Sequence, residues 1–362
     1  MEFFEKFSNM VPMKYYDSSD LKYVKAQEMI SNHKNQFIAM EKRDGEWARA
    51  IILEDEVLIQ SRSISKITGT YGNKTELVPH IVEELRSNYP AGTVLLGELA
   101  FEDITTTSRD VGSILRCKVD KALARQKETK LHFFVFDCLA YNYEDFTKAN
   151  FENRFRLKHV GPSSVLQMRF PMAEYIHVVE HTESDFMEFA EKLWAQGAEG
   201  IVIVRKDAKY KPGSRTAWDT LKLKKQIGEI DMQVIDVIEP KQHYEGTELE
   251  NWKYFEIQKK DSEFGWIHHE FSEGHKAIRS PEFRTIPVTK PYFNGWKNGV
   301  VVQYEGRTIK VSSGLTDEER EWLATSEAQD AIASGSLFAA ITGMEFTEDS
   351  LRHPVFLTFK NK

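Results

Sequence analysis

The sequence lacks most features that mark secreted, disulfide-bonded or membrane-spanning chains. It has only 2 cysteines in 362 residues, Cys117 and Cys138, which excludes a disulfide framework and a four-cysteine zinc site. No run of about 18 apolar residues occurs, so no transmembrane helix and no membrane partner are expected. The first residues do not combine a basic segment with a long apolar one, which excludes a secretory signal. We therefore expect a cytoplasmic protein in a reducing compartment.

The chain also lacks an overall excess of basic residues. Its formal net charge of −8 argues mildly against nucleic-acid binding. Residues 1–228 hold 33 basic and 33 acidic side chains, whereas the remainder holds 15 basic and 23 acidic ones. Because a phosphate backbone requires a local basic track rather than a basic total, the last third is expected to turn its acidic faces away from any nucleic acid.

The chain length and the pattern of apolar and polar residues predict two domains in the α+β class. The hydrophobic content of 41% and the charged content of 29% are those of an ordinary globular protein. The first part mixes buried-type strands with amphipathic helices, and the pattern changes near residues 226–231. Beyond this point, short β-type runs alternate with turn residues, which is typical of a small barrel. The predicted domains are 1–228 and 229–362.

The expected elements follow from the spacing of apolar residues. In the first domain, helices are expected at 20–31, 77–87, 185–196 and within 102–130, and strands at 37–40, 50–53, 57–59, 93–96, 131–139, 201–204 and 220–225. In the second domain, strands are expected at 232–238, 254–258, 300–304, 308–311 and 355–359, with one helix at 317–328.

The most informative stretch is Glu-Lys-Arg-Asp-Gly at 41–45, between two apolar runs. Lys42 lies where one predicted strand turns into the next, and Gly45 gives the backbone freedom for that turn. A lysine whose pKa is tuned by neighbours such as Asp44 can attack phosphorus through its neutral amine. The pattern Lys-x-Asp-Gly is weak by itself, and on this stretch alone a solvated hairpin turn is favoured by about two to one.

Three further candidates follow along the chain, each at the end of a strand or inside one. Arg62 is the middle residue of Ser-Arg-Ser. It is either an ordinary surface arginine or a phosphate ligand, since its planar guanidinium suits a phosphate. Glu98 ends a buried strand, where it could accept a hydrogen bond from a ribose hydroxyl. Phe136 is about equally a core side chain or a platform for a purine ring.

The last candidates of this set are charged and follow a predicted helix. Glu199 precedes a strand, where a lone glutamate is usually solvated. Lys222 and Lys224 lie two residues apart on a strand, so both point to one face. Either that face is exposed to solvent, or the two lysines bind phosphates. Taken together, a lysine nucleophile, two carboxylates, an aromatic platform and paired lysines suit transfer of a nucleotidyl group from a triphosphate.

Six ordered motifs carry a resemblance to the ATP-dependent polynucleotide ligases, whose superfamily includes RNA ligases and mRNA capping enzymes. A short match of this kind is weak alone, whereas six in order are specific. The motifs read Glu-Lys-Arg-Asp-Gly (41–45), Ser-Arg-Ser (61–63), Leu-Gly-Glu-Leu (96–99), Phe-Val-Phe-Asp (134–137), Glu-Gly-Ile-Val-Ile (199–203) and Leu-Lys-Leu-Lys (221–224). Segments 311–320 and 351–360 are similar to the last part of the DNA ligases.

The resemblance implies a nucleotidyltransferase domain with antiparallel sheets and flanking helices, followed by an OB-fold barrel. The size is similar to that of the minimal ligases of bacteriophages and large DNA viruses. The implied cofactors are ATP and Mg²⁺, the implied partner is nicked duplex DNA, and a monomer is expected. The implied roles concern the nucleotide: Lys42 forms lysyl-AMP, Glu98 contacts the ribose, Phe136 stacks on adenine, Glu98 and Glu199 hold the metal, and Lys222 and Lys224 contact the α-phosphate.

Three basic residues outside these motifs receive roles through the same resemblance. Arg352 and Lys360 would orient the leaving pyrophosphate in the first step, and Arg215 would lie near the phosphates. One position departs from the pattern, because the family usually has Lys-x-Asp-Gly-x-Arg, with the arginine on the 5′-phosphate of the nick. Here Trp47 stands at that position. Arg49 shares its strand face and is the expected substitute.

The expected reaction has three steps: adenylation of Lys42, transfer of AMP to the 5′-phosphate of a nick, and attack by the 3′-hydroxyl. An RNA-joining or RNA-repair ligase is the nearest alternative. A capping guanylyltransferase would prefer GTP, and an NAD-dependent ligase would need more cysteines than the chain has. An OB-type single-strand-binding protein is the alternative without catalysis, and it would form no covalent nucleotide.

Overall fold

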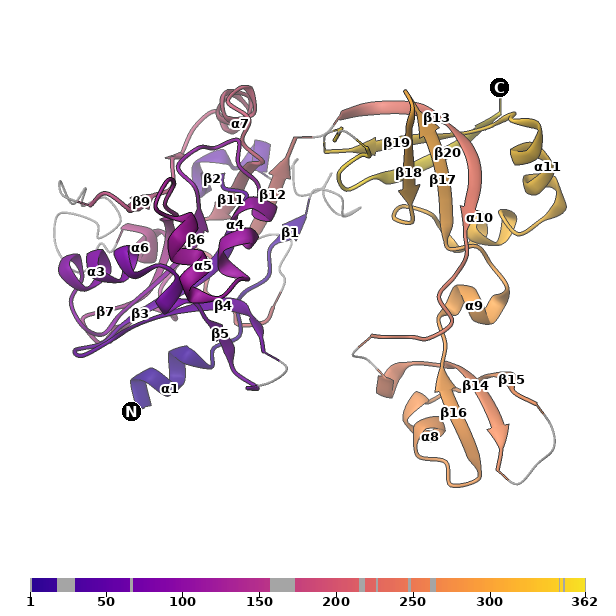
Figure 1. Ribbon diagram of the computed structural model, residues 1–362, viewed down its shortest axis with the longest axis horizontal. Coiled ribbons are helices and arrows are strands. Elements are labelled where there is room, and N and C mark those ends of the chain that lie inside the picture. The colour runs from indigo at the N-terminus through magenta and orange to yellow at the C-terminus, as the bar shows by residue number, and fades with distance from the viewer. Residues whose placement is uncertain are drawn as a thin grey trace. The chain divides into compact units, whose positions relative to one another are not determined.

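The computed structural model describes residues 2–17, 30–65, 68–156, 173–214, 219–225, 227–246, 249–260, 265–344, 346–347 and 349–361. The chain divides into two compact units, 1–225 and 226–362 (Figure 1). The predicted boundary at residue 228 lies close to this division. Most of the expected helix at 20–31 and the candidate Arg215 lie outside the described residues.

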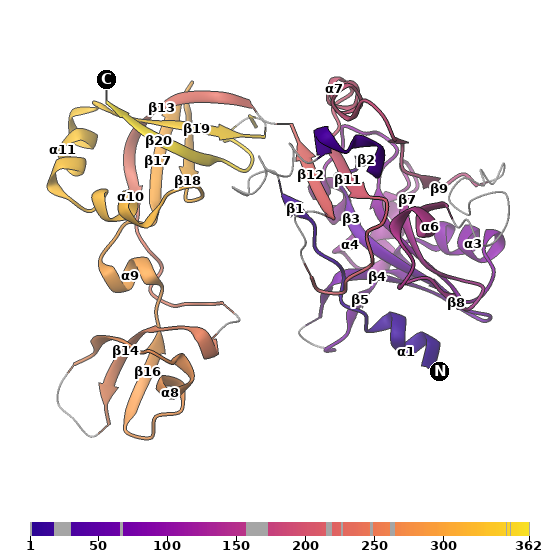
Figure 2. The same cartoon turned by 180° about the vertical axis from the view of Figure 1, so that it is seen from behind.

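The first unit contains a five-stranded sheet, which we call the site sheet. Its strand order is β1-β12-β11-β2-β10. The strands are β1 (Tyr16–Asp17), β2 (Phe37–Lys42), β10 (His181–Thr182), β11 (Gly200–Arg205) and β12 (Thr220–Lys224). All neighbours are antiparallel except β1 and β12, which run parallel. Figures 1 and 2 both show β1 beside β12.

A second sheet of the same unit, the large sheet, has seven strands. Its order is β5-β4-β3-β6-β7-β8, with β9 paired to β7. The strands are β3 (Glu46–Ile52), β4 (Val57–Ile64), β5 (Tyr71–Asn73), β6 (Thr93–Ala100), β7 (His132–Tyr141), β8 (Glu144–Asp145) and β9 (Ile176–Val178). One hydrophobic cluster joins the two sheets, because Ile38 and Met40 of β2 pack with Ala48 of β3 and Leu95 of β6.

The first unit has helices on both sheets. They are α1 (Glu2–Ser8), α3 (Pro79–Asn88), α4 (Ser108–Leu115), α5 (Val119–Arg125), α6 (Phe151–Arg156) and α7 (Phe186–Ala195), with short 3-10 turns at Lys34–Gln36 and Thr75–Leu77. Helix α7 buries Phe189 and Leu193 against Phe37 and Ala39 of β2. It ends before Gly197, whose φ of 91° is easily adopted only by glycine.

The second unit contains a five-stranded antiparallel sheet with the order β18-β17-β13-β19-β20. Its strands are β13 (Ile227–Ile238), β17 (Gly299–Tyr304), β18 (Arg307–Val311), β19 (Leu337–Gly343) and β20 (Val355–Asn361). A bridge joins Ser313, two residues after the edge strand β18, to Val355, the first residue of the other edge strand, β20. The expected helix at 317–328 is two helices, α10 (Asp317–Trp322) and α11 (Ser326–Ser334), because the Thr325 side chain caps the second one.

A small three-stranded sheet is inserted between β13 and β17. Its order is β15-β14-β16, with β14 (Tyr254–Lys259), β15 (Ile267–Glu270) and β16 (Phe283–Pro287). The insertion also holds a 3-10 turn (Leu249–Asn251) and two helices, α8 (Gly274–Ile278) and α9 (Lys290–Asn294). The expected barrel strand at 254–258 was therefore assigned to the wrong sheet. Its alternating pattern predicts a strand but does not specify the partners.

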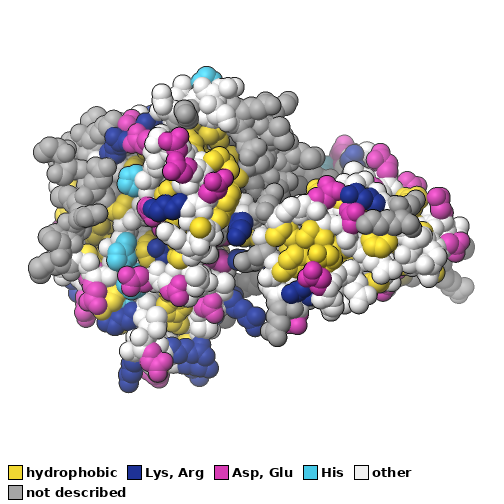
Figure 3. Space-filling view, turned by 90° about the horizontal axis from the view of Figure 1, so that it is seen from above, with side chains coloured by type: hydrophobic (Ala, Val, Ile, Leu, Met, Phe, Trp, Pro, Cys, Tyr) yellow, Lys and Arg dark blue, Asp and Glu magenta, His cyan; other side chains and the backbone are white. Residues whose placement is uncertain are grey.

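The architecture is mixed α+β, with the two sheets and flanking helices of the first unit followed by antiparallel β-structure, as predicted. Figure 3 shows acidic and basic side chains interspersed over the described surface seen from above. Within the described part of the chain, no helix is long and apolar enough to cross a membrane.

Candidate active site

Lys42 is the last residue of β2, and its side chain lies on the face of the site sheet that α7 does not cover. Ile38 and Met40 point to the same face, since alternate residues of a strand share a face. Gly200 of β11 is the register partner of Lys42 on one side and of Lys224 on the other. No side chain therefore separates the two lysines along this row.

The row requires glycine at position 200. The φ of Gly200 is 152°, and a Cβ there would lie 2.0 Å from the carbonyl oxygen of Leu223. A larger residue would clash with the backbone of β12 and force it away from β11. The Glu-Gly pair at the start of β11 thus permits close spacing of the strands that carry the lysines.

Glu199 links the two lysines electrostatically. Its carboxylate forms an ion pair with Lys42 Nζ, and its Oε1 lies 3.5 Å from Lys224 Nζ. The Glu199 side chain is only 5% exposed, and those of Lys42 and Lys224 are 18% and 13% exposed. Charges in such a shielded place interact more strongly than surface charges do. Three predicted site residues are therefore in direct contact.

Glu98 belongs to the same cluster. It lies on β6 opposite Trp47 of β3 and Phe134 of β7. Burial raises the pKa of Glu98 to about 7, the positive charges of Lys42 and Lys222 oppose this rise, and the negative charge of Glu199 adds to it. The carboxyl is therefore close to these three groups and ionises near neutral pH. The negative charge of Asp44 also raises the pKa of Glu98.

The turn at residues 43–45 does not form the predicted hairpin. Strands β2 and β3 belong to different sheets, so the turn carries the chain from the site sheet to the large sheet. Gly45 does not adopt a positive φ there. It is required for another reason, because a Cβ would lie 2.3 Å from the carbonyl oxygen of Leu99 and 2.8 Å from Glu98 Cγ. The absence of a side chain at position 45 thus allows the Lys42 turn to pack closely against β6.

Arg43 fixes this turn, and sequence reasoning gave it no role. Its Nε lies 2.6 Å from the Glu41 carboxylate, and its Nη1 donates to the carbonyl oxygen of Glu102 at 2.8 Å. Its guanidinium carbon lies 4.0 Å from the centre of the Phe134 ring. These contacts join β2, the segment after β6, and β7 immediately beside Lys42. A charged residue within a polar motif gives no sequence signal for such an inward contact.

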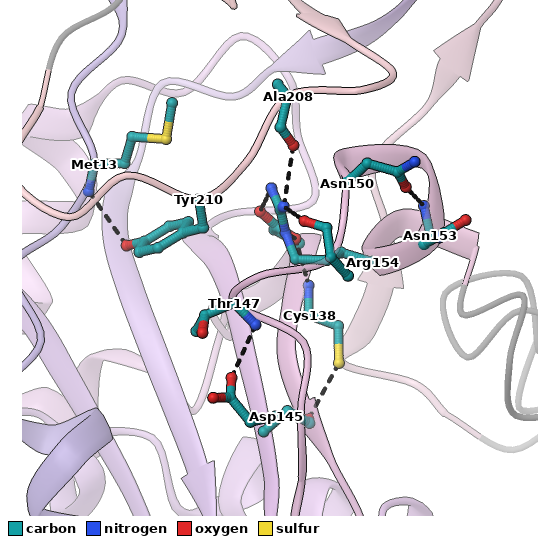
Figure 4. Close-up of polar contacts among 12 residues, drawn as sticks. Met13, Cys138, Asp145, Thr147, Asn150, Asn153, Arg154, Ala208 and Tyr210 are labelled. Carbon is teal, nitrogen blue, oxygen red and sulfur yellow. Dashed lines mark hydrogen bonds and ion pairs between the residues drawn. The ribbon is translucent and has the colours of Figure 1, made fainter.

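Phe136 lies on β7 and is partly buried between two hydrophobic clusters of the first unit. The residue after it, Asp137, forms a buried two-pronged ion pair with Arg154 of α6, at 2.9 and 3.1 Å. Arg154 also donates to the carbonyl oxygens of Ala149 and Ala208, at 2.7 and 3.2 Å (Figure 4). Both charges are thus satisfied, and the pair fixes β7 at the position of Phe136.

The structure contradicts the prediction that Arg49 contacts DNA. Arg49 is 0% exposed. Its guanidinium donates to the carbonyl oxygens of Ser8 and Met10, at 3.0 and 2.6 Å, and to Gln60 Oε1 at 2.8 Å. An arginine so enclosed cannot reach a nick phosphate. Strand alternation correctly placed it on the face of Trp47, but the sequence gave no sign that the N-terminal segment covers that face.

The other basic candidates come from parts of the chain outside the site sheet. Arg62 is exposed near the end of β4. Lys360 lies in the second unit and pairs with Glu229 and Asp231, which raises its pKa. Arg352 is also in the second unit, where its carbonyl oxygen accepts a hydrogen bond from Met344.

The described residues contain no group of three or more histidine, cysteine or acidic side chains suited to a metal. Glu98 and Glu199 provide two neighbouring carboxylates, linked by their mutual charge effect. Magnesium commonly uses one or two carboxylates and completes its shell with water and phosphate oxygens. The oxygen donors of this pair therefore fit Mg²⁺ in the presence of a nucleotide, and do not fit an all-protein cage.

A strand-end lysine that pairs with a carboxylate, with a second lysine on the same carboxylate, provides side chains of the kind that covalent nucleotidyl transfer requires. Residues 21–224 match the family model "ATP dependent DNA ligase domain". Because this match covers more than half of the chain, the protein belongs to the ATP-dependent DNA ligase domain family.

Curated relatives agree over the same region. The chain is 27% identical over 207 residues to a DNA ligase of Nitrosopumilus maritimus (strain SCM1), which covers 55% of this chain and 32% of the relative. It is 26% identical over 222 residues to a DNA ligase of Acidianus ambivalens, covering 58% of this chain and 34% of the relative. The chain thus spans about a third of the length of these relatives.

Solved structures extend the similarity in fold to nearly the whole chain. A structure titled "Pmar-Lig_PreS3" matches with a TM-score of 0.58 and 18% identity, covering 99% of this chain and 70% of that one. A structure from a study of Lig E DNA ligases matches with a TM-score of 0.50 and 18% identity, covering 90% of this chain and 93% of that one. At these identities the matches indicate fold alone.

Proposed function

We propose that the protein is an ATP-dependent DNA ligase that seals nicks between a 3′-hydroxyl and a 5′-phosphate in duplex DNA. The contacts of Glu199 with Lys42 and Lys224, and the action of the charges of Lys42, Glu199 and Lys222 on the Glu98 carboxyl, carry this proposal, together with membership of the family. The protein would act as a monomer inside the cell.

The first step joins AMP to Lys42. The neutral Nζ of Lys42 attacks the α-phosphorus of ATP, the bond to the β-phosphate oxygen breaks, and pyrophosphate leaves. The Glu199 carboxylate, which pairs with Lys42, holds the amine in place and is the group to which its proton can pass. Lys222 and Lys224 neutralise charge that develops on the α-phosphate oxygens.

The remaining nucleotide contacts follow the same arrangement. Phe136 would stack on the adenine ring, and the Glu98 carboxylate would accept a hydrogen bond from the ribose. Arg215, in the segment before β12, would lie near the phosphates. Bound Mg²⁺ would be held by Glu98 and Glu199 and would supply charge stabilisation for the phosphates.

The later steps need the nick and the second unit. AMP passes from Lys42 to the 5′-phosphate, and the 3′-hydroxyl then displaces it to form the phosphodiester bond. With Arg49 buried, Arg62 is the remaining candidate for contact with the 5′-phosphate. We propose that the second unit is an OB-fold whose Arg352 and Lys360 orient the leaving pyrophosphate in the first step.

A sealing assay tests this proposal against the RNA-joining alternative. The purified protein, ATP and Mg²⁺ are incubated with matched nicked duplexes whose 3′-hydroxyl strand, 5′-phosphate strand, both or neither is RNA. We expect the all-DNA nick to be sealed fastest. Faster sealing of a nick flanked by RNA would favour the RNA ligase, and preference for GTP would favour a capping-type enzyme.

A further inference from the structure

The N-terminal segment, residues 2–17, precedes the first residue of the family match. Its first part is fixed to the large sheet, because Phe7 of α1 is buried in the cluster that contains Ile51 and Leu96. Arg49 of β3 then donates hydrogen bonds to the carbonyl oxygens of Ser8 and Met10. The arginine that sequence reasoning assigned to DNA thus holds this segment in place.

The second part of the segment leads to the candidate site. The backbone NH of Met13 donates to the Tyr210 hydroxyl at 3.2 Å (Figure 4), and that of Lys14 donates to the carbonyl oxygen of Ser214 at 3.0 Å. Strand β1 then pairs with β12, where the register partner of Asp17 is Lys222. The segment therefore becomes the edge strand of the site sheet, beside a predicted phosphate-binding lysine.

Tyr15 immediately precedes β1 and lies beside the predicted phosphate-binding Lys222. The Nζ of Lys222 is 5.9 Å from the centre of the Tyr15 ring. Tyr15 packs against the same two hydrophobic clusters as Phe136. Burial and the charge of Asp137 raise the pKa of its hydroxyl, and the charge of Arg62 opposes that rise. The phenol therefore stays neutral, and its ring offers an electron-rich face to a cation.

We propose that Tyr15 is a positioning residue of the nucleotide site, whose ring holds the ammonium of Lys222 where the α-phosphate of ATP binds. This inference rests on the proposed function. A lysine side chain has several rotatable bonds and loses much conformational freedom when it binds a phosphate. A ring beside the ammonium reduces that loss before ATP arrives, which favours the adenylation step.

The test compares three changes at Tyr15 with a matched control. Tyr15→Leu removes the ring, Tyr15→Phe keeps it, and Tyr15→Met is a larger flexible replacement in case the leucine variant does not fold. The control, Tyr143→Leu, removes a tyrosine that is 47% exposed and packs on Phe3 of the same segment. Each protein is freed of bound AMP with pyrophosphate and then labelled with α-labelled ATP and Mg²⁺, with the rate measured across ATP concentrations.

The ring predicts a specific pattern of rates. Tyr15→Leu and Tyr15→Met lower the maximal rate of labelling about fivefold, a size typical of one cation–ring contact, while Tyr15→Phe and Tyr143→Leu label at close to the wild-type rate. In a Lys222→Met background, Tyr15→Leu has no further effect, because the ring then has no ammonium to hold. A purely structural role would lower the unfolding temperature and leave the labelling rate of the folded protein unchanged.

Other results would overturn the inference. Wild-type rates for both Tyr15→Leu and Tyr15→Met would show that the ring is not used. Equal losses in Tyr15→Phe and Tyr15→Leu would assign the effect to the hydroxyl, and independent losses in the Lys222→Met background would remove the link to that lysine. Failure of the wild-type protein to label would instead contradict the proposed function.

Discussion

Glu199 is the residue on which the local geometry of the site depends most, because it pairs with both Lys42 and Lys224. The placement of Lys42 and Lys224 at strand ends could be predicted from the sequence, since motif order and strand alternation both indicate it. The role of Gly45 was misjudged. Its need for close packing against β6 depends on a strand 50 residues away, which a local pattern does not reveal.

At the same scale, Glu98 predicts a pH-dependent stability. Its folded pKa of about 7 is above the ordinary value of 4.5, so the folded protein binds more protons than the unfolded chain between these values. The stability that Glu98 contributes is therefore fully present below about pH 4.5 and is lost as the pH rises through 7. Glu98→Gln should be more stable than wild type by at most about 3 kcal/mol at pH 8 and nearly equal to it at pH 5.

Urea unfolding at the two pH values, without nucleotide or Mg²⁺, measures this difference. A gain of the same size at pH 5 and pH 8 would show that ionisation of Glu98 is not the cause. The same variant should label slowly with ATP, because an amide cannot replace the carboxylate that we propose as a ligand of Mg²⁺.

Arg43 gives a second prediction at the residue scale. Arg43→Met removes the ion pair with Glu41 and the bond to the Glu102 carbonyl oxygen, so the Lys42 turn loses its attachment to the segment after β6. We expect labelling with ATP to slow about tenfold, a size typical of a small misplacement of a reacting group. Arg43→Lys should recover part of the rate.

The matched control is Arg205→Met, the same substitution at the last residue of β11. This residue lies at the end of the strand opposite to Gly200, the register partner of Lys42. If Arg43→Met labelled as fast as Arg205→Met, Arg43 would have no positioning role. Comparison of the two unfolding temperatures separates a loss of folded protein from a loss of rate.

At the scale of elements, the sequence predicted most strands and helices of the first unit but not how they pair. The apolar run of β2 is buried on both faces, by α7 and by the large sheet, so its continuous pattern was informative. The turn after it was taken for a hairpin, because spacing alone does not distinguish a hairpin from a crossing between sheets. The strand at 254–258 was placed in the wrong sheet for a similar reason.

The buried pair of Asp137 and Arg154 joins α6 to β7 and gives a prediction at this scale. Arg154→Met leaves the Asp137 carboxylate buried without its partner, and we expect a loss of about 3–5 kcal/mol in the free energy of unfolding. Arg156→Met on the same helix is the control. The Arg156 side chain is 27% exposed, so its loss should cost at most about 1 kcal/mol.

Urea unfolding of both variants measures the difference. Equal losses would contradict the view that the buried pair fixes β7. An intact fold with slower ATP labelling in Arg154→Met would show that the pair also sets the position of Phe136.

At the scale of the whole molecule, the sequence changes near residue 226 from mixed strand and helix patterns to short β-type runs. This change predicted two domains. The family match ends at residue 224, near the end of the first unit. The inserted sheet of the second unit was missed, because the short runs at 267–270 and 283–287 carry little strand pattern. The path of the N-terminal segment was also missed, since it depends on contacts between residues far apart in the sequence.

The central claim is that Lys42 carries AMP during the reaction. The most direct measurement incubates wild-type and Lys42→Ala proteins, each first treated with pyrophosphate, with Mg²⁺ and α-labelled ATP, followed by a denaturing gel. We expect label on the wild-type protein that is lost when nicked DNA is added, and no label on Lys42→Ala. Label retained by Lys42→Ala, or a wild-type protein that stays unlabelled, would contradict the account.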